Sequence, residues 1–211
     1  MNLKYLLCIL IFFILRGIAY SQNNDVSNLY IIDKIIDESL VPLENEFLVN
    51  GNDVLYNFIT DSDNEKQQYI SESIKKKFQG YRFLSDYTGG NDSGKEVINV
   101  SINNPELSVK YTRTYTDNFL GSIIVERIVT VRYETVFLNS KDSSVIFSNK
   151  FSKNSKSSFN IINIGMVEDR RYSFTYSVIP EESTLNKLIL PAVVILASAV
   201  AVILFFTIRS K

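Results

Sequence analysis

The chain has 211 residues, with 22 basic and 23 acidic side chains, no histidine, no tryptophan and one cysteine, Cys8. Without histidine or a second cysteine, Ser-His-Asp and Cys-His nucleophilic sites and zinc sites built on these residues are excluded, which leaves oxygen-ligated Ca²⁺ or Mg²⁺ among metals. Four basic residues lie outside residues 22–187, so 18 basic residues face 23 acidic ones within that range. The net charge of about −5 gives no electrostatic case for nucleic acid.

The N-terminus has the three parts of a secretory signal. Lys4 is a positive start, Tyr5–Leu15 is an apolar stretch too short to span a bilayer, and small residues precede Gln22. We therefore predict a signal peptide over residues 1–21, cut after Ser21. The alternative is an uncleaved anchor, against which Arg16 argues because a charge there would shorten the span.

The exported part, residues 22–184, is long enough for one domain with its own core. Ser27 can cap a helix that Pro42 ends or kinks. The apolar positions of that helix recur three or four residues apart: Leu29, Ile32, Ile36, Leu40, Leu43 and Phe47. A short strand over Val54–Thr60 and a second helix, capped by Asp63 and ending near Phe78, are predicted to follow.

From Tyr81 onward the apolar pattern changes to a period of two, which predicts strands. The predicted strands are Tyr81–Ser85, Val97–Asn103, Leu107–Tyr115, Ile123–Leu138, Val145–Phe151 and Arg171–Val178. Residues 86–95 and 152–158 are predicted loops, and Ile161–Val167 is ambiguous. The long fourth strand has one apolar and one polar face, typical of an antiparallel sheet covered on one side. We predict an α+β fold, an antiparallel sheet with two helices packed on one face.

The C-terminal segment contains an uninterrupted apolar run, Leu188–Ile208, with Pro191 in its first turn. Its length predicts a transmembrane helix over residues 185–208 that contacts the lipid bilayer. The basic tail 209–211 is expected in the cytoplasm by the positive-inside rule. Together the two terminal signals predict a single-pass protein of the cell (inner) membrane, with its domain periplasmic or extracellular.

The order of elements resembles small periplasmic domains of bacterial envelope-assembly proteins. The similar part is Asn52–Phe151, where VLYNFIT, QQYISESIKKKF, GYRFL and a long meander follow in turn. Domains of this kind occur in the curli-secretion lipoprotein, the lipopolysaccharide-assembly lipoprotein and the Tol-Pal translocation protein. The resemblance implies a role in envelope assembly or secretion. It transfers no functional residue, and the apolar C-terminal segment departs from the pattern.

Gly89–Glu96 nearly matches a nucleotide-binding P-loop, but Glu96 replaces the hydroxyl that would hold Mg²⁺. A P-loop opens a helix, whereas the residues after Glu96 predict a strand. We interpret the segment as a hairpin loop.

One acidic cluster and one basic cluster each have a structural explanation that needs no ligand. Asp61, Asp63 and Glu65 could hold Ca²⁺, but a helix cap with a dipole-complementing carboxylate explains them without a metal. Lys75–Lys77 could contact anionic lipid, but a solvated helix end is the simpler interpretation.

Arg113 and Arg127 fall on apolar strand faces, which predicts internal ion pairs or positions at the end of the sheet rather than ligand sites. Asn91 and Asn99 begin glycosylation sequons, which matter only in a eukaryotic source.

No catalytic, cofactor-binding or metal-binding residue is assigned from the sequence. We predict a non-enzymatic binding domain with an envelope protein as its partner, captured at an exposed strand edge. One alternative is an enzyme using carboxylates or a Ser-Lys pair, although Glu126 and Glu134 would be roughly 26 Å apart along one strand. A glycosylated type I surface protein of a eukaryote is the other alternative.

Overall fold

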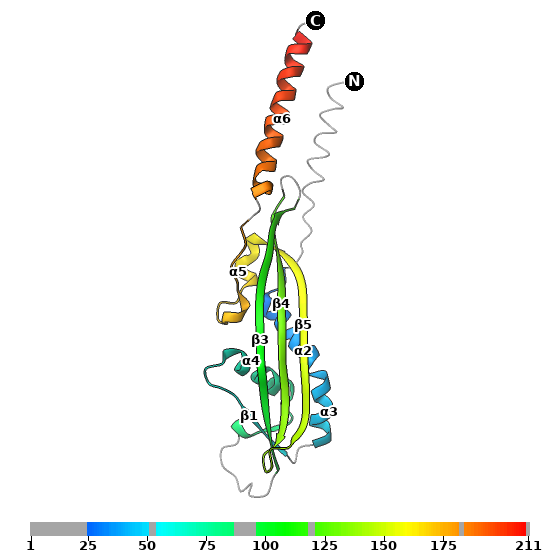
Figure 1. The fold of residues 1–211 in the computed structure, drawn as a ribbon, viewed down its shortest axis with the longest axis vertical. Coiled ribbons are helices and arrows are strands. Elements are labelled where there is room, and N and C mark those ends of the chain that lie inside the picture. Colours follow the sequence, from blue (N-terminus) through cyan, green and yellow to red (C-terminus); the bar gives the residue numbers. More distant parts are fainter. Residues whose placement is uncertain (1–24, 51–53, 87–95, 118–120, 182–183, 210–211) are drawn as a thin grey trace.

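The computed structural model describes residues 25–50, 54–86, 96–117, 121–181 and 184–209. The described part forms one five-stranded sheet in the order β2-β1-β3-β4-β5, with helices against one face (Figure 1). This confirms the α+β class. The predicted signal peptide and its cleavage point lie outside the described residues.

Two helices replace the single helix predicted from Ser27. Helix α2 (Asn28–Ser39) ends before Leu40, and α3 (Val41–Asn50) follows it at once. Ser27 caps α2 as predicted, because its hydroxyl accepts the Tyr30 N–H at 3.1 Å. Pro42 lies in the first turn of α3, where its missing N–H leaves no helical hydrogen bond unmade.

The sheet is mixed, whereas an antiparallel sheet was predicted. Strand β1 (Val54–Ile59) pairs in parallel with both β2 (Arg82–Phe83) and β3 (Glu96–Thr116). Helix α4 (Glu65–Lys77) follows β1 and returns the chain to the starting end of the sheet, which is how parallel neighbours are connected. Strand β2 is shorter than predicted, since the 3₁₀ turn η1 (Leu84–Asp86) takes over.

Strand β3 is continuous where two strands separated by Pro105 were predicted. The ladder to β4 (Ile123–Asn139) shifts register between Asn103 and Glu106, and Asn104 has a φ of 51°. A bulge takes up the residue without an N–H, and asparagine tolerates the left-handed conformation. Pro105 therefore bends the strand without ending it.

Strand β5 (Val145–Asn160) runs antiparallel to β4 over its whole length. It includes residues 152–158, so their assignment to a loop was wrong. Their polar side chains are compatible with a strand at the border of the sheet, where much of each residue meets water.

Residues 161–181, all of them described, contain no strand, so the prediction of one over Arg171–Val178 was also wrong. The chain forms η2 (Ile161–Asn163), α5 (Ile164–Val167) and η3 (Ser173–Thr175). Tyr172 and Phe174 both pack on Tyr69 of α4, with ring centroids 4.9 and 5.2 Å from it. The alternating aromatics are explained by this cluster.

The core lies between the sheet and helices α2, α3 and α4. The predicted dry face of β4 is confirmed, because its five apolar members are at most 3% exposed: Val125, Val129, Val131, Tyr133 and Phe137. Phe47 of α3 contacts Tyr56, Phe78 and Phe137, and so joins both helical layers to the sheet.

Helix α6 (Thr184–Arg209) projects beyond one end of the sheet (Figure 1). It begins before the predicted apolar run, so Pro191 lies inside it and not in its first turn. Among the described residues, no helix has both the length and the apolarity needed to cross a membrane. The helical part of the prediction for Leu188–Ile208 is confirmed, and the membrane-spanning part is not.

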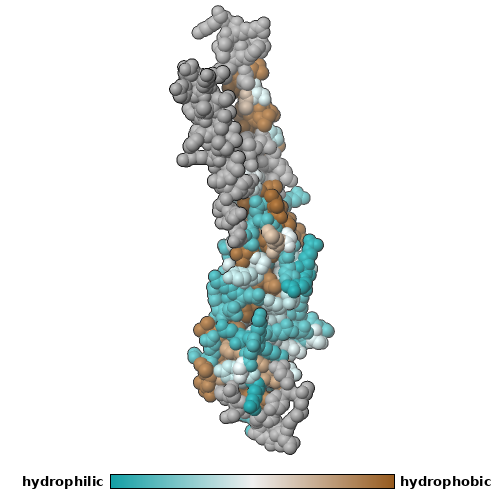
Figure 2. Space-filling model, turned by 180° about the vertical axis from the view of Figure 1, so that it is seen from behind, coloured by the Kyte–Doolittle hydropathy of each residue, from teal (hydrophilic) through white to brown (hydrophobic). Residues whose placement is uncertain are grey.

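Figure 2 shows the molecule from the side opposite to Figure 1. Hydrophilic residues predominate over the body of the domain, and hydrophobic residues gather on the described part of α6. Exposed members of this helix include Val194, Ile195 and Leu196.

Candidate functional site: the groove between helix α2 and edge strand β5

The two borders of the sheet differ greatly in length. On one side, β2 has 2 residues, β1 pairs with β3 only as far as Ser101, and the rest of β3 has no strand partner on that side among the described residues. On the other side, β5 has 16 residues and is paired only with β4 among the described residues. At about 3.3 Å per residue, β5 presents a backbone edge of roughly 50 Å. A long edge of this kind can accept another strand.

The direction of the β5 backbone groups follows from one hydrogen bond. The Asn160 N–H donates to Asp25 Oδ2 at 3.0 Å and therefore points away from β4. Backbone groups alternate sides along an antiparallel strand, and the β4–β5 register is unbroken from Asn160 back to Phe147. Alternate residues therefore direct both N–H and C=O to the open edge: Ser148, Lys150, Ser152, Asn154, Lys156 and Ser158.

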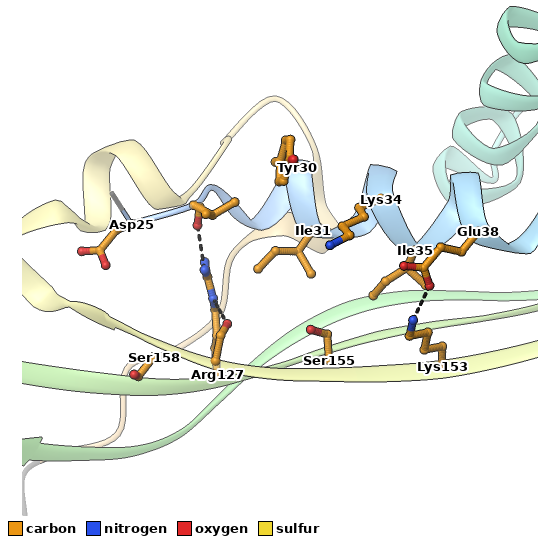
Figure 3. Close-up of a pocket in the computed structure, with 12 residues that line it drawn as sticks. Asp25, Tyr30, Ile31, Lys34, Ile35, Glu38, Arg127, Lys153, Ser155 and Ser158 are labelled. Carbon is orange, nitrogen blue, oxygen red and sulfur yellow. Dashed lines mark hydrogen bonds and ion pairs between the residues drawn. The ribbon is translucent and has the colours of Figure 1, made fainter. Parts of the chain in front are cut away.

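A groove of about 550 Å³ runs between α2 and this edge. Ile31 and Ile35 form its apolar wall on α2, and Ser155 and Ser157 lie on the sheet side. Figure 3 shows Ser155 and Lys153 pointing toward α2 and Ser158 pointing away. Because the two serines are small, the space between helix and strand stays open instead of being filled by core side chains.

One ion pair crosses the groove. Lys153 of β5 pairs with Glu38 of α2, and both side chains are more than two-fifths exposed (Figure 3). The hydrogen bond from Lys153 holds the pKa of Glu38 below its ordinary value. Exposed pairs of this kind contribute little to stability and open readily.

Arg127 closes the groove at the end near the N-terminal arm, residues 25–27. Its guanidinium is 2% exposed and donates to the Val26 carbonyl at 2.7 Å, to Asn28 Oδ1 at 2.6 Å and to Ser157 Oγ at 2.8 Å. Burial lowers the pKa of Arg127, although arginine stays charged in proteins. The predicted internal ion pair is corrected: these three acceptors are neutral, and the charge is satisfied by hydrogen bonds.

Asn28 links the arginine to the segment after β5. Its amide donates to Tyr111 Oη at 3.0 Å and to the Thr175 carbonyl at 2.7 Å. Tyr111 in turn donates to Glu168 at 2.9 Å, and burial raises the pKa of this tyrosine. The network ties the arm, the sheet and the C-terminal segment together, and we assign it a structural role.

The edge strand is basic although residues 22–187 as a whole are acidic. Residues 145–160 contain Lys150, Lys153 and Lys156 and no acidic residue. Lys150 lies 3.6 Å from Glu134 on the neighbouring strand and is 79% exposed. Three lysines at intervals of three place Lys153 on the groove side and the other two on the opposite face.

The acidic cluster predicted at Asp61, Asp63 and Glu65 makes contacts within the chain. Asn64, not Asp63, caps α4 by accepting the Gln67 N–H at 3.1 Å. Asp61 accepts the Asp63 N–H at 3.0 Å, and Glu65 accepts from Ser173. No group of three acidic, histidine or cysteine residues in the described ranges is arranged to hold a metal.

The lysines at the end of α4 also have contacts within the chain. Lys75 donates to Ser85 Oγ at 3.1 Å and lies 5.3 Å from the centre of the Phe58 ring. Lys77 is 3.9 Å from Glu44. The P-loop-like segment falls outside the described residues except for Glu96, which begins β3 and thus confirms a strand after it.

Other predicted positions lie on the outer face of the sheet. Arg113 is opposite Glu126 and is exposed, because a second register shift after Tyr111 turns it out of the apolar face. On the β5 side, Glu126 lies opposite Ser158 and Glu134 lies opposite Lys150. The carboxylates of Glu126 and Glu134 therefore stay apart along β4. The structure gathers none of the singled-out acids into one site.

Of the sequons, Asn91 lies outside the described residues. Asn99 is within β3, between Asn57 and Leu138 of the flanking strands, and its Oδ1 accepts the Asn57 amide at 2.9 Å. A position between two hydrogen-bonded strands leaves little room for a glycan.

The sequence does not predict the groove, because the polar composition of residues 152–158 predicts a loop. One signal could have indicated it: Phe147, Phe151, Ser155 and Phe159 recur at even spacing, which continues the period of two through the polar stretch.

Comparison with known proteins identifies limited similarities. No protein-family model matches the chain. The chain is 26% identical to Vivapain-1 of Plasmodium vivax over 138 residues, 65% of this chain and 22% of that protein. It therefore spans about a fifth of the length of Vivapain-1, which does not establish a family.

A solved structure from a bacterium also shows a match. This is a neuraminyllactose-binding hemagglutinin homologue from Helicobacter pylori, with a TM-score of 0.31 and 12% identity. The match covers 51% of this chain and 67% of the other. A TM-score of this size is too low to establish a common fold or function.

Proposed function

We propose that this protein is a non-enzymatic, exported binding domain of the cell envelope that captures an extended segment of another envelope protein. The segment adds to the sheet as a sixth strand along β5. The single observation that carries the proposal is the open edge of β5, whose outward N–H and C=O groups lie beside a groove with an apolar wall.

The physical basis is main-chain hydrogen bonding: the outward N–H and C=O groups of β5 have no strand partner among the described residues. An added strand forms main-chain hydrogen bonds with the edge, while its alternate side chains enter the groove. Ile31, which is only partly buried, offers apolar surface to those side chains. On the opposite side β2 has only 2 residues, and the stretch of β3 beyond Ser101 is contacted by other parts of the chain. Gln67 of α4 donates to the Ile102 carbonyl, and Thr114 donates to the Pro180 carbonyl. Capture is therefore assigned to β5.

Site-specific crosslinking in cells tests the proposal on the full chain. A photoreactive residue at Ser148 on the β5 edge is compared with one at Lys110, an exposed position of β3 that β4 separates from β5. We expect a discrete crosslinked partner at Ser148 and none at Lys110. Asn154→Pro should remove the crosslink, because proline deletes an outward N–H without breaking the ladder to β4.

Asn154→Ala is the matched control, since it keeps the N–H, and Ser152→Pro repeats the test at a second outward position. Circular dichroism and thermal unfolding establish that each variant is folded. Equal crosslinking in the folded proline and alanine variants would show that the partner does not add to this edge.

A further inference from the structure

We propose that the segment captured by β5 is acidic, with carboxylates at intervals of three residues that face the three lysines of the strand. This inference rests on the proposed function and specifies the chemistry of its partner. Its starting point is the local charge: Lys150, Lys153 and Lys156 lie on a strand without acids, in a domain that is acidic overall.

The spacing defines the complementary pattern. Side chains of directly opposite residues on paired strands lie on the same face of the sheet. A segment with acids at every third position therefore presents one to the groove side, opposite Lys153, and two to the outer face, opposite Lys150 and Lys156. Each acid meets a lysine without a change in strand geometry.

Three contacts within the chain show carboxylates already using this surface. Glu134 of β4 lies 3.6 Å from Lys150 on the outer face, where a carboxylate of the partner would share this lysine. Asp25 accepts the outward N–H of Asn160 and closes that end of the edge. Glu38 reaches across the groove to Lys153. The open window is therefore residues 148–158, and a carboxylate of the partner can replace Glu38 at Lys153.

The same charges argue against a second copy of this chain as the occupant. An antiparallel pair of β5 strands centred on Lys153 would place Lys153 opposite itself and Lys150 opposite Lys156. Like charges directly opposite are destabilising. Lysines on edge strands also hinder unwanted pairing. The three lysines of β5 therefore disfavour a neutral or basic strand and favour an acidic one.

Fluorescence anisotropy with the full chain in a non-ionic detergent tests the inference. The probe is a labelled 11-residue peptide of threonine and valine with glutamate at its third, sixth and ninth positions. We expect it to bind, and a peptide with lysine at those positions to bind at least about tenfold more weakly. Added salt should weaken the glutamate peptide, because exposed charges are screened.

Three variants locate the binding. Combined Lys150→Glu, Lys153→Glu and Lys156→Glu should lower the affinity for the glutamate peptide at least about tenfold. Lys110→Glu, the same reversal on β3, which β4 separates from β5, should not. Glu38→Gln should raise the affinity by up to about fivefold, because it releases Lys153 from a weak competing pair.

The outcomes separate this inference from the proposed function. If both peptides bind equally and Asn154→Pro abolishes both, strand capture stands and the acidic specificity is wrong. Glutamate-peptide binding that survives in folded Asn154→Pro would overturn strand addition. No binding of either peptide up to about 1 mM, or self-association of the chain through β5 in analytical ultracentrifugation, would overturn the inference as well.

Discussion

Arg113 and Arg127 show how two residues of one type, both predicted on apolar strand faces, acquire different roles. Arg127 is buried and joins the N-terminal arm, α2 and β5 through one neutral acceptor on each. Arg113 is exposed and lies 5.0 Å from the Tyr115 ring. The period of two in the sequence correctly predicted that Arg127 lies on the buried face of β4. It failed for Arg113 because a register shift, which has no clear sequence signature, reverses the faces of β3 after Tyr111.

Replacing Arg127 by methionine should therefore destabilise the protein, because Asn28 Oδ1 and the Val26 carbonyl lose their donor in a buried site. We expect a loss of about 3 kcal/mol in the free energy of unfolding, measured by urea denaturation. Arg113→Met is the control and should change the value by less than about 0.5 kcal/mol. Similar losses in both variants would contradict the assigned role of Arg127.

At the scale of elements, β5 is the clearest case of tertiary structure overriding local composition. Residues 152–158 are rich in serine, lysine and asparagine, which suggest a loop. They form a strand because the long apolar β4 offers a template beside them and Phe159 anchors the end of the strand in the core. A strand at the border can keep one edge and one face in water, so polar residues are not excluded.

Hydrogen exchange of backbone amides can check the alternation in β5. Amides of outward residues such as Ser152 and Asn154 should exchange at least about tenfold faster than those of inward neighbours such as Lys153 and Ser155, whose N–H groups bond to β4. NMR at single-residue resolution measures this in the free protein. Uniform exchange along the strand would contradict the derived direction of the backbone groups.

For the whole molecule, the decisive feature is that helices and sheet share one core. Phe47 is fully buried and contacts aromatic rings from β1, β4 and the end of α4. Its burial was implied by the helical apolar pattern, but its partners are far apart in the sequence. A core joined in this way should unfold as one unit, because loss of one helix exposes the others.

Phe47→Ala should accordingly lower the free energy of unfolding by about 3–5 kcal/mol and keep a single transition. Leu48→Ala is the matched control, since Leu48 is 69% exposed on the same helix and should have a small effect. Thermal unfolding followed by circular dichroism and by tyrosine fluorescence measures both. Separate transitions for the two probes would show that α3 is not part of the common core.

The amino-acid sequence by itself determined the α+β class, the Ser27 cap and the buried face of β4. These features depend on the periodicity of apolar residues and on hydrogen bonds between residues close in the chain. Both can be recognised from a short stretch of sequence. The same holds for the helix over Leu188–Ile208, whose apolar residues form the larger part of α6.

Only the tertiary structure decided the parallel pairing of β1, the strand conformation of residues 152–158 and the groove beside them. Each depends on contacts between segments that are distant in the chain, and such contacts can outweigh local preference. The candidate site was therefore predictable in kind, as an exposed strand edge, but not in place, because which strand lies at the border is a property of the assembled sheet.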